Sequence, residues 1–185
     1  MTVTAPLYAQ ILGGSWNQLA EPLRRLHGTD SITRAHGNLR IEHGRHPLAR
    51  LLARMLRLPQ PTAAAETQLV VVPRADGEHW QRTFNTHRLE TLQYPCDGEL
   101  AERFGAFEFR FRLEASGGSL RFLQREAFAC WHVRLRIPAR FAPRVDARED
   151  PAGPERIQVE VRVTLPWVGL LISYAGLIEV GEMRS

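Results

Sequence analysis

The chain has 185 residues, of which 44% are hydrophobic and 24% are charged, and its formal net charge is +4. This length allows a sizeable core, and the composition is ordinary for a soluble globular protein. All 24 of the Lys and Arg positions hold arginine, spread along the whole chain and interleaved with acids. We attribute this to codon usage rather than to a phosphate site, and we expect no nucleic-acid binding.

The first 60 residues carry the helical signals. Residues 7–12 and 16–27 have helical spacing of apolar side chains and are separated by Gly13 and Gly14, and Ser15 is a candidate N-cap for the second helix. Residues 32–43 alternate like a strand. Residues 61–66 follow a helix that ends at prolines, so we predict a linker loop there.

Residues 47–58 form the clearest predicted helix, because Pro47 suits a first helical turn. Its apolar stripe consists of Leu48, Leu51, Leu52 and Met55. Arginines on the opposite side leave two interpretations: a core helix whose stripe covers the sheet, or an interfacial helix whose arginines meet lipid head groups. The stripe is narrow enough for one sheet to cover, so we favour the core helix over contact with a membrane surface.

The most regular strand pattern lies at residues 107–114. Apolar side chains there alternate with charged ones, in the order Phe107, Glu108, Phe109, Arg110, Phe111, Arg112, Leu113 and Glu114. A period of two predicts a strand with one buried face and one solvated face, which is typical of an antiparallel sheet. We therefore expect the phenylalanines to be buried and Arg110 to contribute little to stability.

Similar short patterns, separated by turn signals, fill most of the chain after residue 60, and we count about nine strands. We predict one domain over residues 1–185 with a mainly β (α+β) fold. Residues 61–185 would form a strongly curved antiparallel or barrel-like sheet, covered by two or three N-terminal helices from a cap at residues 1–60 that also holds one strand. The most apolar run, residues 163–180, is interrupted by Pro166, Gly169 and Glu179, so we predict a strand pair rather than a membrane helix.

Several short motifs follow one another in a recognisable order. They are residues 8–13, Trp16, residues 23–27, 47–59, 79–84, 100–105 and 159–171. In this order they resemble an uncharacterised bacterial family, DUF4166, over nearly the whole chain. In that family the domain occurs alone or attached to dehydrogenase-like oxidoreductase domains. The resemblance therefore implies an oxidoreductase partner. It implies no established activity and no catalytic residue, and the chain has no Gly-rich nucleotide fingerprint after a strand.

Trp80, Arg82 and Phe84 share one parity of a predicted strand. If the two aromatic side chains face inward, Arg82 does too. A buried guanidinium needs a carboxylate or a bound anion, because its desolvation alone is costly. Arg82 is therefore the most specific candidate for holding an acidic ligand group.

Arg103, beside the central strand, is a second candidate of the same kind. The alternative for either arginine is a structural salt bridge, for instance to Glu102 or Glu90. We predict the ligand-binding residues to be Arg82, Trp80, Phe84, Arg103 and Tyr174.

Signals for other chemistry are weak. His43 and His46, with His36 nearby, fall short of a convergent zinc ligand set, so we expect no metal. Cys96 and Cys130 have no CxxC spacing, and residues 1–8 do not look like a secretory leader, which favours a cytoplasmic location. We name no catalytic residue and expect no cofactor.

We expect a non-enzymatic binding or accessory module with an apolar pocket for an amphipathic or lipid-like acidic ligand. Two alternatives remain open: a protein-interaction domain with a packed core, and an enzyme that uses His and carboxylates from separate strands. A cavity larger than a few waters would favour binding over the packed core. Convergence of His with Asp or Glu inside that cavity would favour the enzyme.

Overall fold

The computed structural model describes residues 5–28 and 30–181. Residues 1–4, half of the segment considered above as a possible secretory leader, are outside the described residues. The helical elements are α1 (Leu7–Leu12), the 3-10 helix η1 (Gly13–Gln18), α2 (Glu21–His27) and α3 (Pro47–Met55). The strands are β1 (Thr33–His43), β2 (Thr62–Arg74), β3 (Gly77–Phe84), β4 (His87–Cys96), β5 (Glu99–Phe104), β6 (Phe107–Ser116), β7 (Ser119–Cys130), β8 (Arg134–Arg136), β9 (Arg144–Pro151), β10 (Arg156–Leu165) and β11 (Gly169–Gly181).

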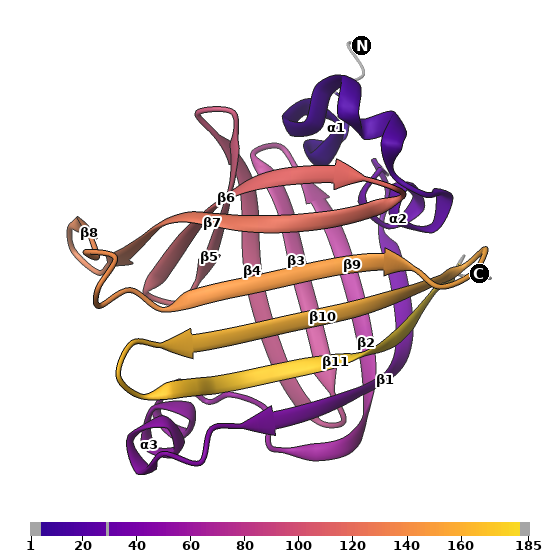
Figure 1. Ribbon diagram of the computed structural model, residues 1–185. Helices are drawn as coiled ribbons and strands as arrows, with labels where there is room; N and C mark the ends of the chain where they lie inside the picture. The colour runs from indigo at the N-terminus through magenta and orange to yellow at the C-terminus, as the bar shows by residue number, and fades with distance from the viewer. Residues whose placement is uncertain (1–4, 29, 182–185) are drawn as a thin grey trace.

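The strands form one antiparallel sheet that closes on itself. Its order is β6-β5-β4-β3-β2-β1-β11-β10-β9-β7-β8, and an additional β6–β7 pairing closes a ring of 10 strands. In Figure 1, strands β7, β9, β10 and β11 in front cross β2, β3 and β4 behind at a steep angle, as expected of a strongly twisted sheet. The mainly β, barrel-like prediction is confirmed, with 11 strands in place of about nine.

Strand β7 closes the ring because it has different partners along its length. It pairs with β6 from Ser116↔Ser119 to Phe107↔Ala129, and with β9 only over its first residues. Its far end, Phe128 to Cys130, pairs instead with β8. Strand β8 is therefore an extra strand outside the ring, beside a gap where β7 and β9 have separated.

The N-terminal helices close one end of the barrel (Figure 1). Tyr8, Leu23 and Leu26 of this segment are almost fully buried. Backbone hydrogen bonds of 3.0 Å join Gly118 N to Gln18 O and Ala20 N to Gly118 O, so the segment is tied to the β6–β7 turn. The second predicted helix is in fact η1 followed by α2, and Ser15 lies inside η1 instead of capping a helix.

Helix α3 contacts β11 and β1 near the other end, and its predicted packing is confirmed for Leu52, which packs against the core, but is wrong for the rest of the predicted stripe. Leu48, Leu51 and Met55 are 43%, 53% and 69% exposed, whereas Ala49 and Ala53 are 0% and 1% exposed. The buried stripe is the neighbouring one, which has equally good helical spacing and consists of Ala49, Leu52, Ala53 and Leu56. Small alanines let the helix approach the strands closely, so the larger side chains beside them remain outside.

Two further predictions about local structure are wrong. Residues 62–66 belong to β2 rather than to a linker, because their backbone pairs with β1, as in Leu39↔Ala65. The charged face of β6 is not wholly solvated, since Glu108 and Arg110 are 4% and 8% exposed.

The predicted strand pair at residues 163–180 is confirmed by β10 and β11. Within the described chain, no helix has the length and apolar character needed to cross a membrane.

Candidate functional site

The barrel encloses a cavity of about 360 Å³. One end of its lining is Tyr8 of α1, and the other includes Leu52 of α3, its C-cap residue Leu56, and Phe141. Much of the wall between them is aromatic or aliphatic, from Phe104, Phe107, Phe109, Phe111, Phe122, Leu89, Val145, Val161 and Val163. The volume lies within the roughly 300–1,000 Å³ typical of small-molecule sites. It far exceeds the roughly 10–15 Å³ that one water needs.

Arg82 of β3 lines this cavity with its side chain only 16% exposed. Strand parity places it between the inward Trp80 and Phe84, as the sequence predicts. Its Nη1 donates to Thr91 Oγ1 at 2.9 Å, and its Nη2 lies 3.4 Å from Glu102 Oε1. The guanidinium also lies 5.0 Å from the centre of the Trp80 ring. These contacts use two of its five N–H donors, and no other described residue accepts from the rest.

Tyr174 of β11 shares this part of the cavity with Arg82. Burial raises the pKa of Tyr174, while the charge of Arg82 opposes that increase. Burial lowers the pKa of Arg82, but Tyr174 and Glu102 more than offset it, and its pKa is raised overall. The pair therefore presents a neutral hydroxyl and a cation to the cavity at neutral pH. No described residue hydrogen-bonds the Tyr174 hydroxyl, so both groups can serve a ligand.

A polar cluster forms the closed end of the cavity, beneath the N-terminal helices. Tyr8 donates to Gln93 Oε1 at 2.6 Å, and His27 Nε2 lies 2.6 Å from Glu149 Oε2. The rings of Tyr8 and His27 are in contact, with centroids 4.0 Å apart and planes tilted by 37°. Burial raises the pKa of Tyr8, with a further increase from Glu78. These contacts join α1 and α2 to β4 and β9, so the cluster fastens the helices to the barrel.

Glu78 of β3 belongs to the same end. Burial raises its pKa, and this increase is opposed by the hydrogen bond from Trp80 Nε1, 2.9 Å away, and by His27. The bond to Glu78 fixes the Trp80 indole, which in turn forms one wall beside Arg82. The orientation of the Trp80 side chain in the cavity wall thus depends on the Glu78 carboxyl group, which lies behind it.

The structure brings together three of the five predicted ligand-binding residues. Trp80, Arg82 and Tyr174 line the cavity, and Phe84 is buried behind Tyr174 with ring centroids 5.5 Å apart. Arg103 lies outside: it is exposed, on the opposite face of β5 from Glu102. Whether these residues bind a ligand stays a prediction.

The prediction from sequence missed several polar residues of the cavity, namely Tyr8, Thr91, Gln93 and Glu149. Alternation with Leu89 on β4 could have placed Thr91 and Gln93 inside. Nothing local in the sequence points to Tyr8 or to the His27–Glu149 pair, because their partners are 85 and 122 residues away.

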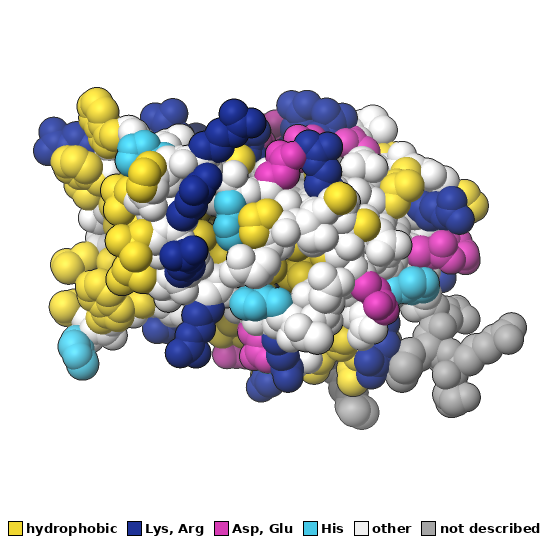
Figure 2. All heavy atoms as spheres, turned by 90° about the horizontal axis from the view of Figure 1, so that it is seen from below, with side chains coloured by type: hydrophobic (Ala, Val, Ile, Leu, Met, Phe, Trp, Pro, Cys, Tyr) yellow, Lys and Arg dark blue, Asp and Glu magenta, His cyan; other side chains and the backbone are white. Residues whose placement is uncertain are grey.

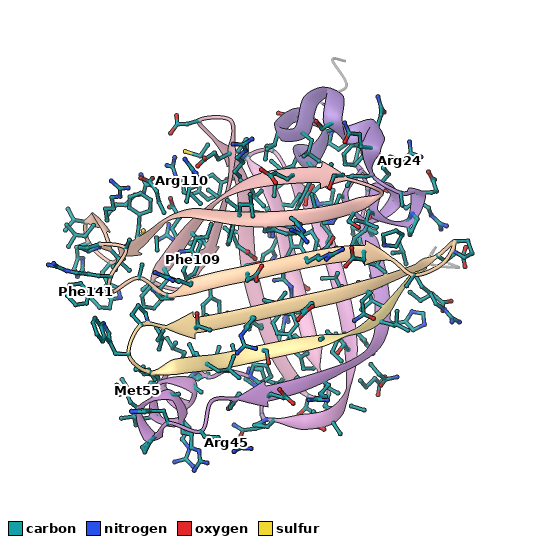
Figure 3. All side chains as sticks on the ribbon, viewed as in Figure 1. Arg24, Arg45, Met55, Phe109, Arg110 and Phe141 are labelled. Carbon is teal, nitrogen blue, oxygen red and sulfur yellow. The ribbon has the colours of Figure 1, made fainter. Side chains whose placement is uncertain are left out.

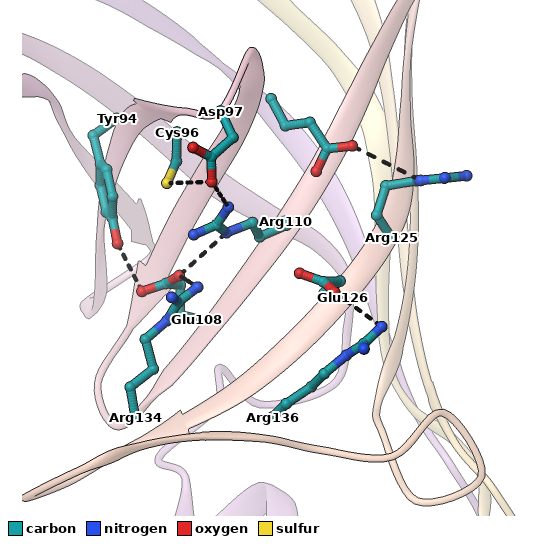
Figure 4. A network of polar contacts seen from close by, with 10 residues as sticks. Tyr94, Cys96, Asp97, Glu108, Arg110, Arg125, Glu126, Arg134 and Arg136 are labelled. Carbon is teal, nitrogen blue, oxygen red and sulfur yellow. Dashed lines mark hydrogen bonds and ion pairs between the residues drawn. The ribbon is translucent and has the colours of Figure 1, made fainter.

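A second polar network lies on the outer face of β6 and explains the burial of Glu108 and Arg110 (Figure 4). Arg110 Nη1 donates to Asp97 Oδ2 at 2.8 Å, and Glu108 accepts from Tyr94 at 2.7 Å and from Arg134 at 2.7 Å. The Arg134 guanidinium lies 3.7 Å from the centre of the Phe128 ring. This network ties β8 to the barrel, and we assign it a structural role.

The predicted histidine candidates have structural contacts. His43 Nε2 lies 2.8 Å from Pro59 O, and His46 Nδ1 accepts from Leu48 N at the start of α3. The described part of the chain contains no group of three His, Cys, Asp or Glu side chains that could hold a metal. Cys96 and Cys130 are free thiols.

Comparison with known protein families gives a match over most of the chain. The model of a family described as a domain of unknown function, DUF4166, matches residues 19–178. No curated protein and no solved structure matches the chain.

Proposed function

The chain belongs to the DUF4166 family, and we propose that it is a non-enzymatic binding module whose barrel holds a lipid-like molecule with an acidic head group. The single observation that carries this proposal is Arg82, a mostly buried cation with donors to spare, set in an otherwise largely apolar cavity of about 360 Å³. A carboxylate or similar group would accept from Arg82 and from the Tyr174 hydroxyl. The apolar tail would replace water along the phenylalanine-rich wall.

Glu102 decides which kind of head group fits. Its carboxylate is the only described acidic contact of Arg82, and at 3.4 Å the contact is long for a charged hydrogen bond. An acidic head group would compete with Glu102 for the guanidinium, whereas a donor such as an alcohol would use Glu102 as an acceptor. Replacement of Glu102 therefore separates the two classes of ligand.

Two observations bear on the alternatives. The size of the cavity supports binding over a protein-interaction domain with a packed core. The His27–Glu149 pair offers a histidine next to a carboxylate, but only Glu149 lines the cavity and His27 lies behind it. The enzyme alternative has less support for that reason.

The test is a fluorescence titration with the fatty acid cis-parinaric acid, preceded by native mass spectrometry for a co-purified molecule. Arg82→Met should weaken binding about tenfold to a hundredfold, because charge-assisted hydrogen bonds to the head group are lost. Glu102→Gln should bind at least as tightly as the wild type, because a competing carboxylate is removed.

Arg103→Met is the matched control, since Arg103 is an exposed arginine on the same strand as Glu102. It should bind like the wild type. The double variant Arg82→Met/Glu102→Gln leaves no unpaired carboxylate, so it should stay folded and still bind weakly. Equal affinity in the wild type and the double variant would show that Arg82 does not hold the head group.

A further inference from the structure

Large apolar side chains are exposed together at the end of the barrel where the cavity meets α3. We call them the mouth patch and define it as Leu51, Met55, Trp131, Val133, Phe141 and Trp167, which are 53%, 69%, 78%, 68%, 56% and 87% exposed. They come from α3, from the segment around β8 and from the β10–β11 turn, which lie at the same end in Figure 1. Figure 2 shows hydrophobic side chains gathered at that end, and Figure 3 places Met55 and Phe141 there.

The segments that carry the mouth patch are rich in arginine and poor in acidic residues. Residues 43–65 and residues 127–145 each contain four arginines and no Asp or Glu, and residues 163–178 contain no Asp, Glu, Lys or Arg. Arg45, Arg50 and Arg54 on and before α3 are exposed and form no ion pair with a described residue. Arg134 and Arg136 are paired with Glu108 and Glu126, so the unpaired cations border the patch on its α3 side. An apolar surface with unpaired cations beside it is complementary to a surface that is apolar within and anionic outside.

Trp167 has a backbone conformation that points to a role for its exposed side chain. Its φ is 68°, in the left-handed region that bulky residues seldom adopt. Such a conformation costs free energy. Packing of the indole offsets little of this cost, because the Trp167 side chain is 87% exposed. The β10–β11 turn therefore holds a tryptophan outward at some cost to stability.

We propose that the mouth patch docks on the surface of an anionic lipid bilayer. Tryptophan favours the boundary between head groups and acyl chains, and arginines beside it would meet the lipid phosphates. A second copy of the chain fits less well, because a symmetric contact would bring unpaired arginines of both copies together.

The cavity continues to the mouth patch. Phe141 belongs to both, and Leu52 and Leu56 of the cavity wall lie beside Leu51 and Met55 on α3. If the barrel holds a lipid-like molecule, as proposed above, docking would let that molecule move between bilayer and cavity with little exposure to water. The docking itself does not depend on a ligand.

The test is flotation of the full chain with vesicles of phosphatidylcholine alone or mixed with phosphatidylglycerol. We expect binding to the mixed vesicles, a blue shift of tryptophan emission on binding, and weaker binding as salt rises. Trp131→Ala/Trp167→Ala should lower the affinity about tenfold or more, because two interfacial anchors are removed. Arg50→Glu/Arg54→Glu should lower it by a similar factor, because two attractive charges become repulsive.

Matched controls come from outside the patch. Ile32→Ala/Leu177→Ala removes two other exposed apolar side chains, and Arg121→Glu/Arg162→Glu reverses two other exposed charges. Both control variants, and Arg82→Met, should bind vesicles like the wild type.

The proposal is overturned if the wild type does not bind the mixed vesicles, or if Trp131→Ala/Trp167→Ala binds them as tightly as the wild type. Self-association in analytical ultracentrifugation that the tryptophan variant abolishes would assign the patch to a dimer instead. Loss of fatty-acid binding in Arg82→Met has no bearing on docking, so the two proposals can fail separately.

Discussion

Individual charged residues of this barrel differ in role according to what covers them. Arg110 and Arg112 face the same side of β6, yet their side chains are 10% and 63% exposed. Arg110 packs against the Phe128 ring and forms an ion pair with Asp97, whereas the ion-pair partner of Arg112 among the described residues is the exposed Glu114. Burial of a guanidinium makes its partners matter, because an unpaired charge left behind is costly.

We predict that Arg110→Ala lowers the free energy of unfolding by about 2 kcal/mol, because Glu108 loses a cation and the cover over Phe128 opens. Arg112→Ala is the control on the same strand face and should change it by less than about 0.5 kcal/mol. Denaturant unfolding of both variants measures the difference. Equal small effects would mean that the outer network does not contribute to stability.

Tyr94 gives a pH-dependent prediction. Burial and the hydrogen bond to Glu108 raise its pKa to about 12 from an ordinary 10.0. A raised pKa means that the folded state binds the proton more tightly, so the stabilisation is fully present below pH 10.0 and is lost as the pH rises through about 12. The difference in unfolding free energy between wild type and Tyr94→Phe should therefore shrink over that interval. A difference that stays constant up to pH 12 would contradict the raised pKa.

Among the elements, α3 departs most from its expected packing. It presents two neighbouring stripes with helical spacing, one of leucines and one containing Ala49 and Ala53. The alanine stripe faces β11 and β1, because small side chains allow the backbone to come close. Of the leucine stripe, Leu52 lines the cavity, whereas Leu48, Leu51 and Met55 remain at the surface beside the cavity mouth.

Substitutions in the two stripes should change the free energy of unfolding by different amounts. Ala53→Leu should lower the free energy of unfolding by about 1–3 kcal/mol, because the site has no room for a larger side chain. Leu51→Ser should change it by less than about 0.5 kcal/mol, because Leu51 is already largely exposed. Thermal unfolding compares the two; a larger loss for Leu51→Ser would restore the packing predicted from sequence.

At the scale of the whole molecule, closure of the ring creates both the cavity and its two different ends. The N-terminal helices seal one end through the Tyr8–Gln93 and His27–Glu149 contacts. The other end lies where β7 leaves β9, next to α3 and the exposed tryptophans. A closed polar end and an open apolar end suit the binding of an amphipathic molecule, and they motivate both proposals.

The oxidoreductase partner implied by family resemblance stays a prediction.

The sequence by itself determined most of the strands and the shared face of Trp80, Arg82 and Phe84, but not that this face is the inner one. Side chains alternate across a strand with a period of two, so a local pattern is enough to place Trp80, Arg82 and Phe84 on one face. For the same reason the regular alternation of β6 and β10 identified them as antiparallel strands. The order of short motifs also identified the family.

Only the tertiary structure decided which of the remaining surfaces are covered. The period of a strand does not say which residues cover each of its faces. Phe128 and Tyr94 bury the charged side of β6. The alanines at the start of β2 are in a strand because their backbone pairs with β1. Arg103 and Arg82 look alike in sequence, yet one is outside and the other inside because β5 and β3 turn different faces to the cavity. The choice between two stripes of α3 depended on how near β11 lies. These outcomes rest on contacts between distant segments, for which a local pattern has no signal.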